Sequence, residues 1–237
     1  MCDMKHQTVG FICPMDCELE AVTSLFSDVT RKEFGGQSFY CGTIAGVPAV
    51  AAKCGVGKVF AAICAQAMIL GFSPSLIINT GVAGNLSDTL SIGDIVISSS
   101  VVQHDMDTSP IGDPVGLISG INKVYIESDA TAASCMAEAL SEIGLPYERG
   151  VVASGDQFVA TDAQRSFIRD TFGALCCEME GAAVGQVCFL HGVPFLVLRA
   201  LSDGADGSFP DDFPAYCVQV SKNSSRAIAA FMGKWKR

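Results

Sequence analysis

Apolar strand-like runs and helix-like segments alternate along the whole chain, and this alternation limits the possible folds more than any other feature. The expected strands lie at 8–13, 48–54, 76–79, 94–102, 150–153, 175–178 and 194–201. The expected helices lie at 16–26, 58–70, 129–142, 162–172, 181–190 and 215–235. Strands that are apolar on both faces need helices on both sides of their sheet. The pattern therefore predicts an α/β fold, with a single three-layer α/β/α domain over residues 1–237.

Hydrophobic residues make up 49% of the chain and charged residues 17%, a composition apolar enough to raise the question of a membrane span. The longest apolar stretch, Val59 to Phe72, is shorter than the roughly 20 residues that cross a bilayer, and Gln66 interrupts it. The segment from Met1 to Gln7 is polar and does not resemble a secretory leader. We therefore expect a cytoplasmic protein with no membrane partner, whose apolar surplus lies in a buried sheet and a subunit interface.

The formal net charge of −10 disfavours nucleic acid as a partner. Basic residues cluster only at Lys234, Lys236 and Arg237, where they suit the end of a helix. The 11 cysteines include no Cys-x-x-Cys pair, and the three histidines are far apart in the sequence. Closely spaced metal ligands are thus absent, so we expect no metal site and treat the cysteines as small buried side chains of a reducing compartment.

Carboxylates follow most of the expected strands. In α/β folds ligands bind beyond the carboxyl ends of the strands. Five such loops lie at 15–18, 80–84, 154–158, 178–180 and 202–203; four of them contain Asp or Glu, and none contains Lys or Arg. A site lined with acids disfavours phosphate, and the segment from Gly81 to Gly84 lacks the lysine of a phosphate-binding loop. Its small residues are expected to let a flat ligand approach the backbone.

Carboxylates that converge on one pocket suit the hydrolysis of a glycosidic bond. One protonated acid assists the leaving group, and a second carboxylate orients water toward the sugar. Asp203, which directly follows the most apolar strand, is the candidate acid. Capping of a helix is the alternative role for any single acid, and we expect it for Asp16, while Glu178 is expected to be structural.

Motifs in these loops resemble those of 5′-methylthioadenosine/S-adenosylhomocysteine nucleosidases, which belong to the purine nucleoside phosphorylase and nucleosidase superfamily. The matching segments, in order, are 10–18, 53–59, 79–84, 93–97, 104–107, 154–158, 178–183 and 199–203. The combination of Ser-Gly-Asp-x-Phe, Glu-Met-Glu and Arg-Ala-x-Ser-Asp is the specific part, and the resemblance covers nearly the whole chain. It implies a nucleoside phosphorylase-like fold around a central mixed twisted sheet, no cofactor, and a homodimer.

The resemblance also implies an activity, the hydrolysis of the N-glycosidic bond of methylthioadenosine and S-adenosylhomocysteine in methionine salvage. Asp203 would protonate N7 of adenine, Glu18 would orient the attacking water, and Glu180 would bind the ribose hydroxyls. Phe158 would stack on the adenine, and Met179 would pack against the sugar. The implied substrate-binding residues are Met15, Ala83, Gly84, Phe158, Val159, Met179 and Ser202.

Three alternatives remain open at this point. A purine nucleoside phosphorylase would use phosphate in place of water, but the Glu18 carboxylate would repel it. An aminodeoxyfutalosine nucleosidase would share the chemistry and differ in substrate, and a nucleoside-binding module would have none. The segments 108–116 and 207–212 depart from the family pattern, which leaves the preferred 5′ substituent open. Asp113 is hypothesised to favour a substituent that carries an ammonium group.

Overall fold

The computed structural model describes residues 8–203 and 213–235; the expectations for residues 1–7 and 207–212 lie outside these ranges. The strands are β1 Val9–Cys13, β2 Ser27–Phe34, β3 Gln37–Ile44, β4 Val47–Lys53, β5 Leu76–Asn85, β6 Ile95–Gln103, β7 Ile126–Glu127, β8 Tyr147–Ser154, β9 Ala174–Glu178 and β10 Phe195–Leu201. The helices are α1 Asp16–Thr23, α2 Lys58–Phe72, α3 Ala130–Glu142, α4 Asp162–Phe172, α5 Gly181–His191 and α6 Phe213–Lys234. A 3₁₀ turn, η2, spans Ser109–Ile111.

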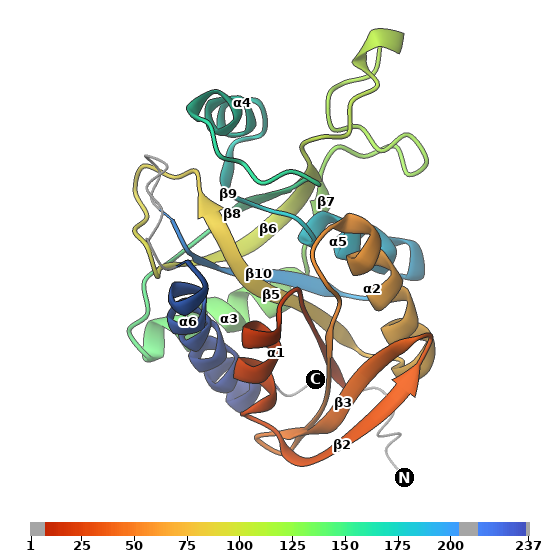
Figure 1. Cartoon of the computed structure of the whole chain (residues 1–237), viewed down its shortest axis with the longest axis vertical. Helices are drawn as coiled ribbons and strands as arrows, with labels where there is room; N and C mark the ends of the chain where they lie inside the picture. Colours follow the sequence, from red (N-terminus) through yellow and green to blue (C-terminus); the bar gives the residue numbers. More distant parts are fainter. Residues whose placement is uncertain (1–7, 204–212, 236–237) are drawn as a thin grey trace.

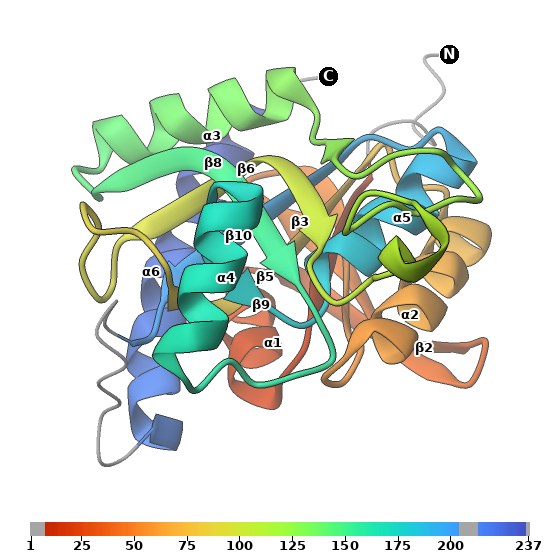
Figure 2. The same ribbon diagram turned by 90° about the horizontal axis from the view of Figure 1, so that it is seen from above.

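Helices cover both faces of one mixed sheet, so the α/β prediction is confirmed (Figures 1 and 2). In β1, Phe11 packs in a core with α1, α3 and α6, whereas its neighbour Ile12 packs in a second core with α2 and α5. Ile78 and Ile77 in β5 divide between the two cores in the same way. Successive side chains of a strand point to opposite faces, so a continuous apolar run supplies both cores at once.

The sheet closes on itself over part of its width. Its strand order is β10-β6-β8-β9-β5-β1-β4-β3-β2, and β10 also pairs with β5. The parallel β10–β5 pairing and the antiparallel β5–β9 pairing thus join β5, β10, β6, β8 and β9 into a ring. The sequence does not indicate this closure, because nothing in a strand's own pattern specifies two partners on different parts of its length.

Strand β5 is longer than the sequence predicts. The strand does not end before Gly81 but continues to Asn85, where its last residues pair with β9. A Cβ atom at Gly81 would lie 2.5 Å from Arg199 Nη1 and 2.6 Å from Glu18 Oε1. The glycine is therefore required for the close approach of these two side chains and does not mark a turn.

The β2–β3 hairpin extends the sheet at one edge and was not expected. Every residue of β2 is exposed, so the strand has no apolar alternation that would reveal it. Its charged residues, Asp28, Arg31, Lys32 and Glu33, suit an edge strand that must not pair with other chains. Among the described helices, none has the length and apolar character needed to cross a membrane.

Candidate functional site

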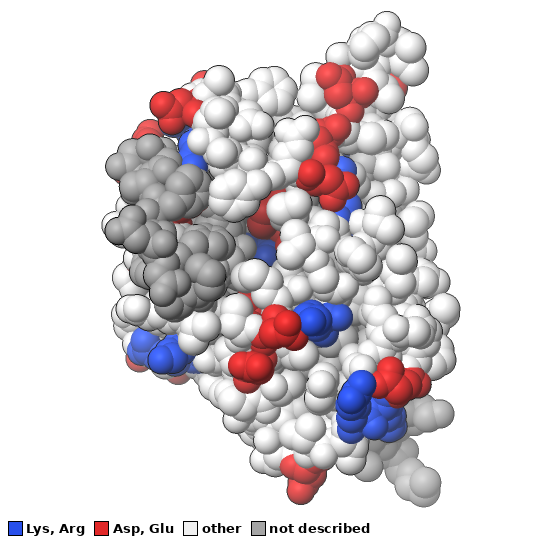
Figure 3. Space-filling view, in the orientation of Figure 1, with Lys and Arg blue, Asp and Glu red and all other residues white. Residues whose placement is uncertain are grey.

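A cavity of about 240 Å³ lies at the carboxyl ends of β1, β9 and β10, beside the second half of β5. Figure 3 shows acidic and basic side chains together in a hollow on this face. All ten residues to which the resemblance assigns a role line the cavity: Met15, Glu18, Ala83, Gly84, Phe158, Val159, Met179, Glu180, Ser202 and Asp203. The fold thus brings together segments from the two ends of the chain in one wall.

Glu18 is held at the start of α1 by backbone donors. It is buried, and its Oε2 accepts a hydrogen bond from the N–H of Met15 at 2.8 Å, while its Oε1 accepts one from the N–H of Val82 at 2.9 Å. Burial raises the pKa of Glu18, and the charge of Arg199 opposes this shift. Both carboxylate oxygens are fixed, so the group has one orientation in the cavity wall.

Asp16 does not cap α1, contrary to expectation. The N-cap is Met15, whose N–H is bound by the Glu18 carboxylate from the third helical position. Asp16 is the first residue of the helix, and its carboxylate instead lies 2.8 Å from Lys53 Nζ in an exposed ion pair. Glu18 therefore fulfils the capping role, two residues later in the sequence than expected.

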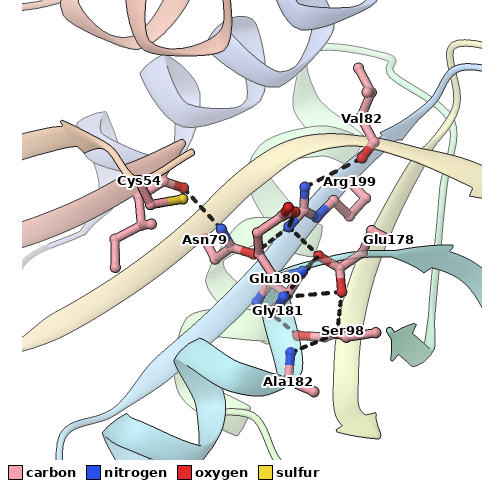
Figure 4. A network of polar contacts seen from close by, with 12 residues as sticks. Cys54, Asn79, Val82, Ser98, Glu178, Glu180, Gly181, Ala182 and Arg199 are labelled. Carbon is pink, nitrogen blue, oxygen red and sulfur yellow. Dashed lines mark hydrogen bonds and ion pairs between the residues drawn. The ribbon is translucent and has the colours of Figure 1, made fainter. Parts of the chain in front are cut away.

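Arg199 is the main site residue that the sequence analysis missed. It projects from β10 and is almost fully buried, and its Nη2 donates to Glu178 and Asn79 and lies 3.4 Å from Oε2 of Glu180 (Figure 4). A lone arginine within an otherwise apolar strand was the available signal, because a buried cation needs anionic partners. The expectation of a cavity without cations is therefore wrong.

Glu178 is the structural centre of this network. Its carboxylate accepts hydrogen bonds from Ser154 Oγ, from Arg199, and from the N–H groups of Glu180 and Gly181 at 3.0 and 2.8 Å. These amides belong to the start of α5, where an anion is favourable. Glu178 thus compensates the Arg199 charge and caps α5, as the expected structural role requires.

Glu180 is the second carboxyl group beside Arg199. Its Oε1 accepts a hydrogen bond from the N–H of Gly57 at 2.9 Å, and its side chain is buried beside Glu178. Burial raises the pKa of Glu180 to about 7, while the attraction of Arg199 works in the opposite direction. The carboxyl is therefore partly protonated near neutral pH.

Asp203 lies directly after β10 and is also buried. Its Oδ1 accepts a hydrogen bond from the N–H of Asn85 at 2.7 Å, and its Oδ2 lies 3.7 Å from Nη2 of Arg165. Ser202, next to it, is anchored by a hydrogen bond from its N–H to the carbonyl of Ala83 at 3.0 Å. The end of β10 is therefore tied to β5 at two consecutive residues.

Arg165 is the second residue that the sequence analysis missed. It lies on α4 and is buried with Ile168 and Phe172, on the inner face of that helix. The spacing in the sequence indicates its burial. Arg165 precedes Ile168 by three residues and Phe172 by seven, so all three lie on the same face of the helix, the face that is buried.

The remaining wall is largely apolar. Phe158 lines the cavity, and 59% of its surface is exposed. Val56 and Pro14 add further apolar surface. The segment 108–116 extends away from the sheet, and its Asp113 accepts a hydrogen bond from Thr108 Oγ1 without lining the cavity (Figure 1). The hypothesis that Asp113 selects the 5′ substituent has no support within one chain.

Three buried carboxyl groups, those of Glu18, Glu180 and Asp203, and a largely apolar wall line the cavity. In residues 8–203 and 213–235 no group of three His, Cys, Asp or Glu side chains is arranged to hold a metal ion. The arrangement can transfer a proton at one end of the cavity and bind hydroxyl groups or water at the other.

Comparisons with known proteins agree with this chemistry. The profile of the phosphorylase superfamily matches residues 8–232. A 5′-methylthioadenosine/S-adenosylhomocysteine nucleosidase of Shewanella sp. (strain W3-18-1) is 34% identical over 230 residues, which cover 96% of this chain and 99% of the relative. The chain belongs to this nucleosidase family of the phosphorylase superfamily. The corresponding nucleosidase of Shewanella baltica (strain OS195) is 36% identical over 93% of this chain and 94% of its own.

Solved structures of the nucleosidase family have the same fold. The nucleosidase of Neisseria meningitidis, in complex with methylthio-immucillin-A, has a TM-score of 0.91 at 32% identity, covering 97% of this chain and 100% of its own. The futalosine hydrolase of Helicobacter pylori has a TM-score of 0.92 at 31% identity, covering 98% of this chain and 100% of its own. The resemblance and the nucleoside phosphorylase-like fold predicted from the sequence are therefore confirmed.

Proposed function

We propose that this nucleosidase hydrolyses the N-glycosidic bond of 5′-methylthioadenosine and S-adenosylhomocysteine and releases adenine and the thioribose, a step of methionine salvage. The observation that carries the proposal is the convergence of Glu18, Glu180 and Asp203 on one cavity. The names of the relatives support the substrate class. The reaction consumes only water and needs no cofactor.

Asp203 is the proposed general acid. It donates a proton to N7 of adenine as the bond between C1′ and N9 breaks, so that the base leaves neutral. The N–H of Asn85 and the nearby Arg165 then stabilise the carboxylate that remains. Ser202, anchored to β5, sets the position of Asp203.

Glu18 and Glu180 act on the sugar. Glu18 accepts a proton from the water whose oxygen adds to C1′, and the burial that raises its pKa makes it a stronger base. Glu180 accepts hydrogen bonds from the ribose hydroxyls. Met179 packs against the sugar, and Met15 lines the cavity beside Glu18.

The adenine ring lies between Phe158 and the backbone of β5. Phe158, in the cavity wall, stacks on the base, and the backbone of Val159 recognises its edge. A Cβ atom at Gly84 would lie 3.2 Å from Cys177 Sγ and 3.3 Å from Asp203 Oδ2, so only a small residue leaves room for the base. Ala83 continues this narrow surface.

An aminodeoxyfutalosine is the second candidate substrate, favoured by the likeness to futalosine hydrolase. Such a nucleoside has the same adenine and ribose and differs only at the 5′ position. A phosphorylase is disfavoured, because Arg199 Nη2 is already engaged by Glu178 and Asn79, and Glu18 would repel phosphate.

The test is incubation with methylthioadenosine in phosphate-free buffer, followed by chromatography and mass analysis. Adenine and methylthioribose are expected from the natural protein, and neither from Asp203→Asn. A sugar phosphate that forms only after phosphate is added would refute hydrolysis. Turnover of aminodeoxyfutalosine alone would replace the proposed substrate by the second candidate.

We further propose that residues 1–237 form one cytoplasmic nucleosidase domain that assembles as a homodimer without nucleic acid. Helices α2 and α5 pack side by side and expose large apolar side chains, among them Phe60, Ile63 and Leu190. Val56, which lines the cavity, immediately precedes this surface, so a second copy there would lie near the substrate. Sedimentation analysis should show a dimer that Ile63→Glu converts to a monomer; a monomeric natural protein would refute the assembly.

A further inference from the structure

The start of α2 binds two carboxylates through consecutive backbone amides. The N–H of Gly57 donates to Oε1 of Glu180 at 2.9 Å, and the N–H of Lys58 donates to Oδ1 of Asp156 at 2.8 Å. Glu180 lines the sugar end of the cavity, and Asp156 immediately precedes Gln157 and Phe158, which line its base end. The start of one helix therefore binds a lining residue of the sugar end and the residue next to the lining residues of the base end.

Side chains reinforce the second of these contacts. Lys58 Nζ lies 2.6 Å from Oδ1 of Asp105, donates to Oε1 of Gln103 at 3.1 Å, and lies 4.0 Å from Oδ2 of Asp156. Oδ2 of Asp105 in turn accepts a hydrogen bond from the N–H of Asp156 at 2.9 Å. Burial alone would raise the pKa of Asp105, but the hydrogen bonds from Lys58 and Asp156 hold it below its ordinary value.

The backbone of Gly57 permits this arrangement. Its φ is +106°, a conformation that glycine adopts without strain, and a Cβ atom there would lie 3.2 Å from Oδ1 of Asp156. The side chain of Lys58 is only 18% exposed and that of Asp105 only 21%. An ion pair that is largely removed from water is less screened than one on the surface, so its geometry is better defined.

We propose that Lys58, Asp105 and Asp156 form a latch that fixes the distance between Phe158, the base wall, and Glu180, the sugar carboxylate. The latch residues touch neither base nor sugar; they are positioning residues. This inference rests on the proposed function for the roles of Phe158 and Glu180. Because the latch joins the loop after β8 to the start of α2, its loss frees Phe158 while Glu180 keeps its contact with Gly57.

The test compares Lys58→Met, Asp105→Asn and the conservative Lys58→Arg with a control, Lys53→Met. Lys53 also pairs with an aspartate, but on the exposed surface beside Asp16. Lys58→Met and Asp105→Asn should weaken the binding of adenine, measured by calorimetry, by about tenfold, the scale of a lost aromatic stack. Lys58→Arg should recover most of the affinity, and Lys53→Met should bind as the natural protein does.

A double-mutant cycle separates positioning from general stability. If Lys58 acts through Phe158, the double variant Lys58→Met/Phe158→Ala should bind adenine no more weakly than Phe158→Ala alone. Additive losses, or a lower Tm with unchanged adenine affinity in Lys58→Met, would overturn the latch.

Amide hydrogen exchange over residues 156–158, measured without ligand, tests the latch independently of the activity. Exchange should be about tenfold faster in Lys58→Met than in Lys53→Met, and equal rates would overturn the proposal. A natural protein that hydrolyses no thionucleoside would refute the proposed function, and the exchange rates would still decide whether the latch exists.

Discussion

Arg165 on α4 places Nη2 3.7 Å from Oδ2 of Asp203, and both side chains are buried. A cation this close stabilises the carboxylate that the proposed general acid becomes when it gives up its proton. The proposed acid and this cation come from different elements, 38 positions apart in the sequence.

The first prediction concerns this pair. Arg165→Met removes this cation, so the carboxylate left after proton transfer loses a counter-charge, and kcat/KM should fall about 10- to 100-fold. Arg165→Lys keeps the charge and should lose less. Arg169→Met, on the exposed side of the same helix, is the control. Equal kcat/KM for Arg165→Met and Arg169→Met would show that Arg165 does not assist the acid.

The second prediction uses the two oxygens of Glu18. Oε1 and Oε2 each accept a backbone N–H, so Glu18→Gln must turn its NH₂ group toward one of these donors. We expect a loss of about 1–3 kcal/mol in the free energy of unfolding, from one unsatisfied buried donor. Turnover should fall about 10²–10⁴-fold. Urea unfolding measures the stability of both variants, with the exposed Glu20→Gln as the control. Equal stability of the two variants would contradict the two hydrogen bonds to Glu18.

The third prediction concerns Gly81. Gly81→Ala places a methyl group against Arg199 and Glu18, so both side chains must shift. The variant should lose about 1–3 kcal/mol of stability through overpacking and about 10²-fold in kcat/KM through misplacement. Gly120→Ala, with no atom within 4 Å of its added carbon, is the matched control. A Gly81→Ala enzyme with natural activity would mean that Arg199 and Glu18 need not lie where they do.

The fourth prediction is a pH dependence of stability. The pKa of Glu180 is raised from 4.5 to about 7, so the folded protein holds this proton to a higher pH than the unfolded chain does. The associated stability is complete below pH 4.5 and is lost as the pH rises to about 7, at most about 3 kcal/mol. Glu180→Gln should remove this loss and be more stable than the natural protein above pH 7.

Urea unfolding at a series of pH values measures this effect. The exposed variant Glu138→Gln is the control. Its free energy of unfolding should fall between pH 4.5 and about pH 7 as steeply as that of the natural protein. An equally steep fall in the free energy of unfolding of Glu180→Gln would show that another group causes the pH dependence.

Local sequence patterns are sufficient to predict the layers of the fold and the segments that line the cavity. Continuous apolar runs such as β10 need cover on both faces, and carboxylates at strand ends meet at one edge of a sheet. These are local rules, so they hold for Glu18 and Asp203 without knowledge of any partner. The α2 and α4 helices follow from apolar spacing in the same way.

The pairing of the buried charges, in contrast, depends on contacts between distant parts of the chain. Arg199 and Arg165 lie within a strand and on a helix face, outside the loops where ligands were expected, and each finds its anion far along the chain. The continuation of β5 past Gly81 and the closure of the sheet likewise depend on long-range pairing. A buried charge is tolerated only where the whole fold supplies its counter-charge, and no local pattern contains that information.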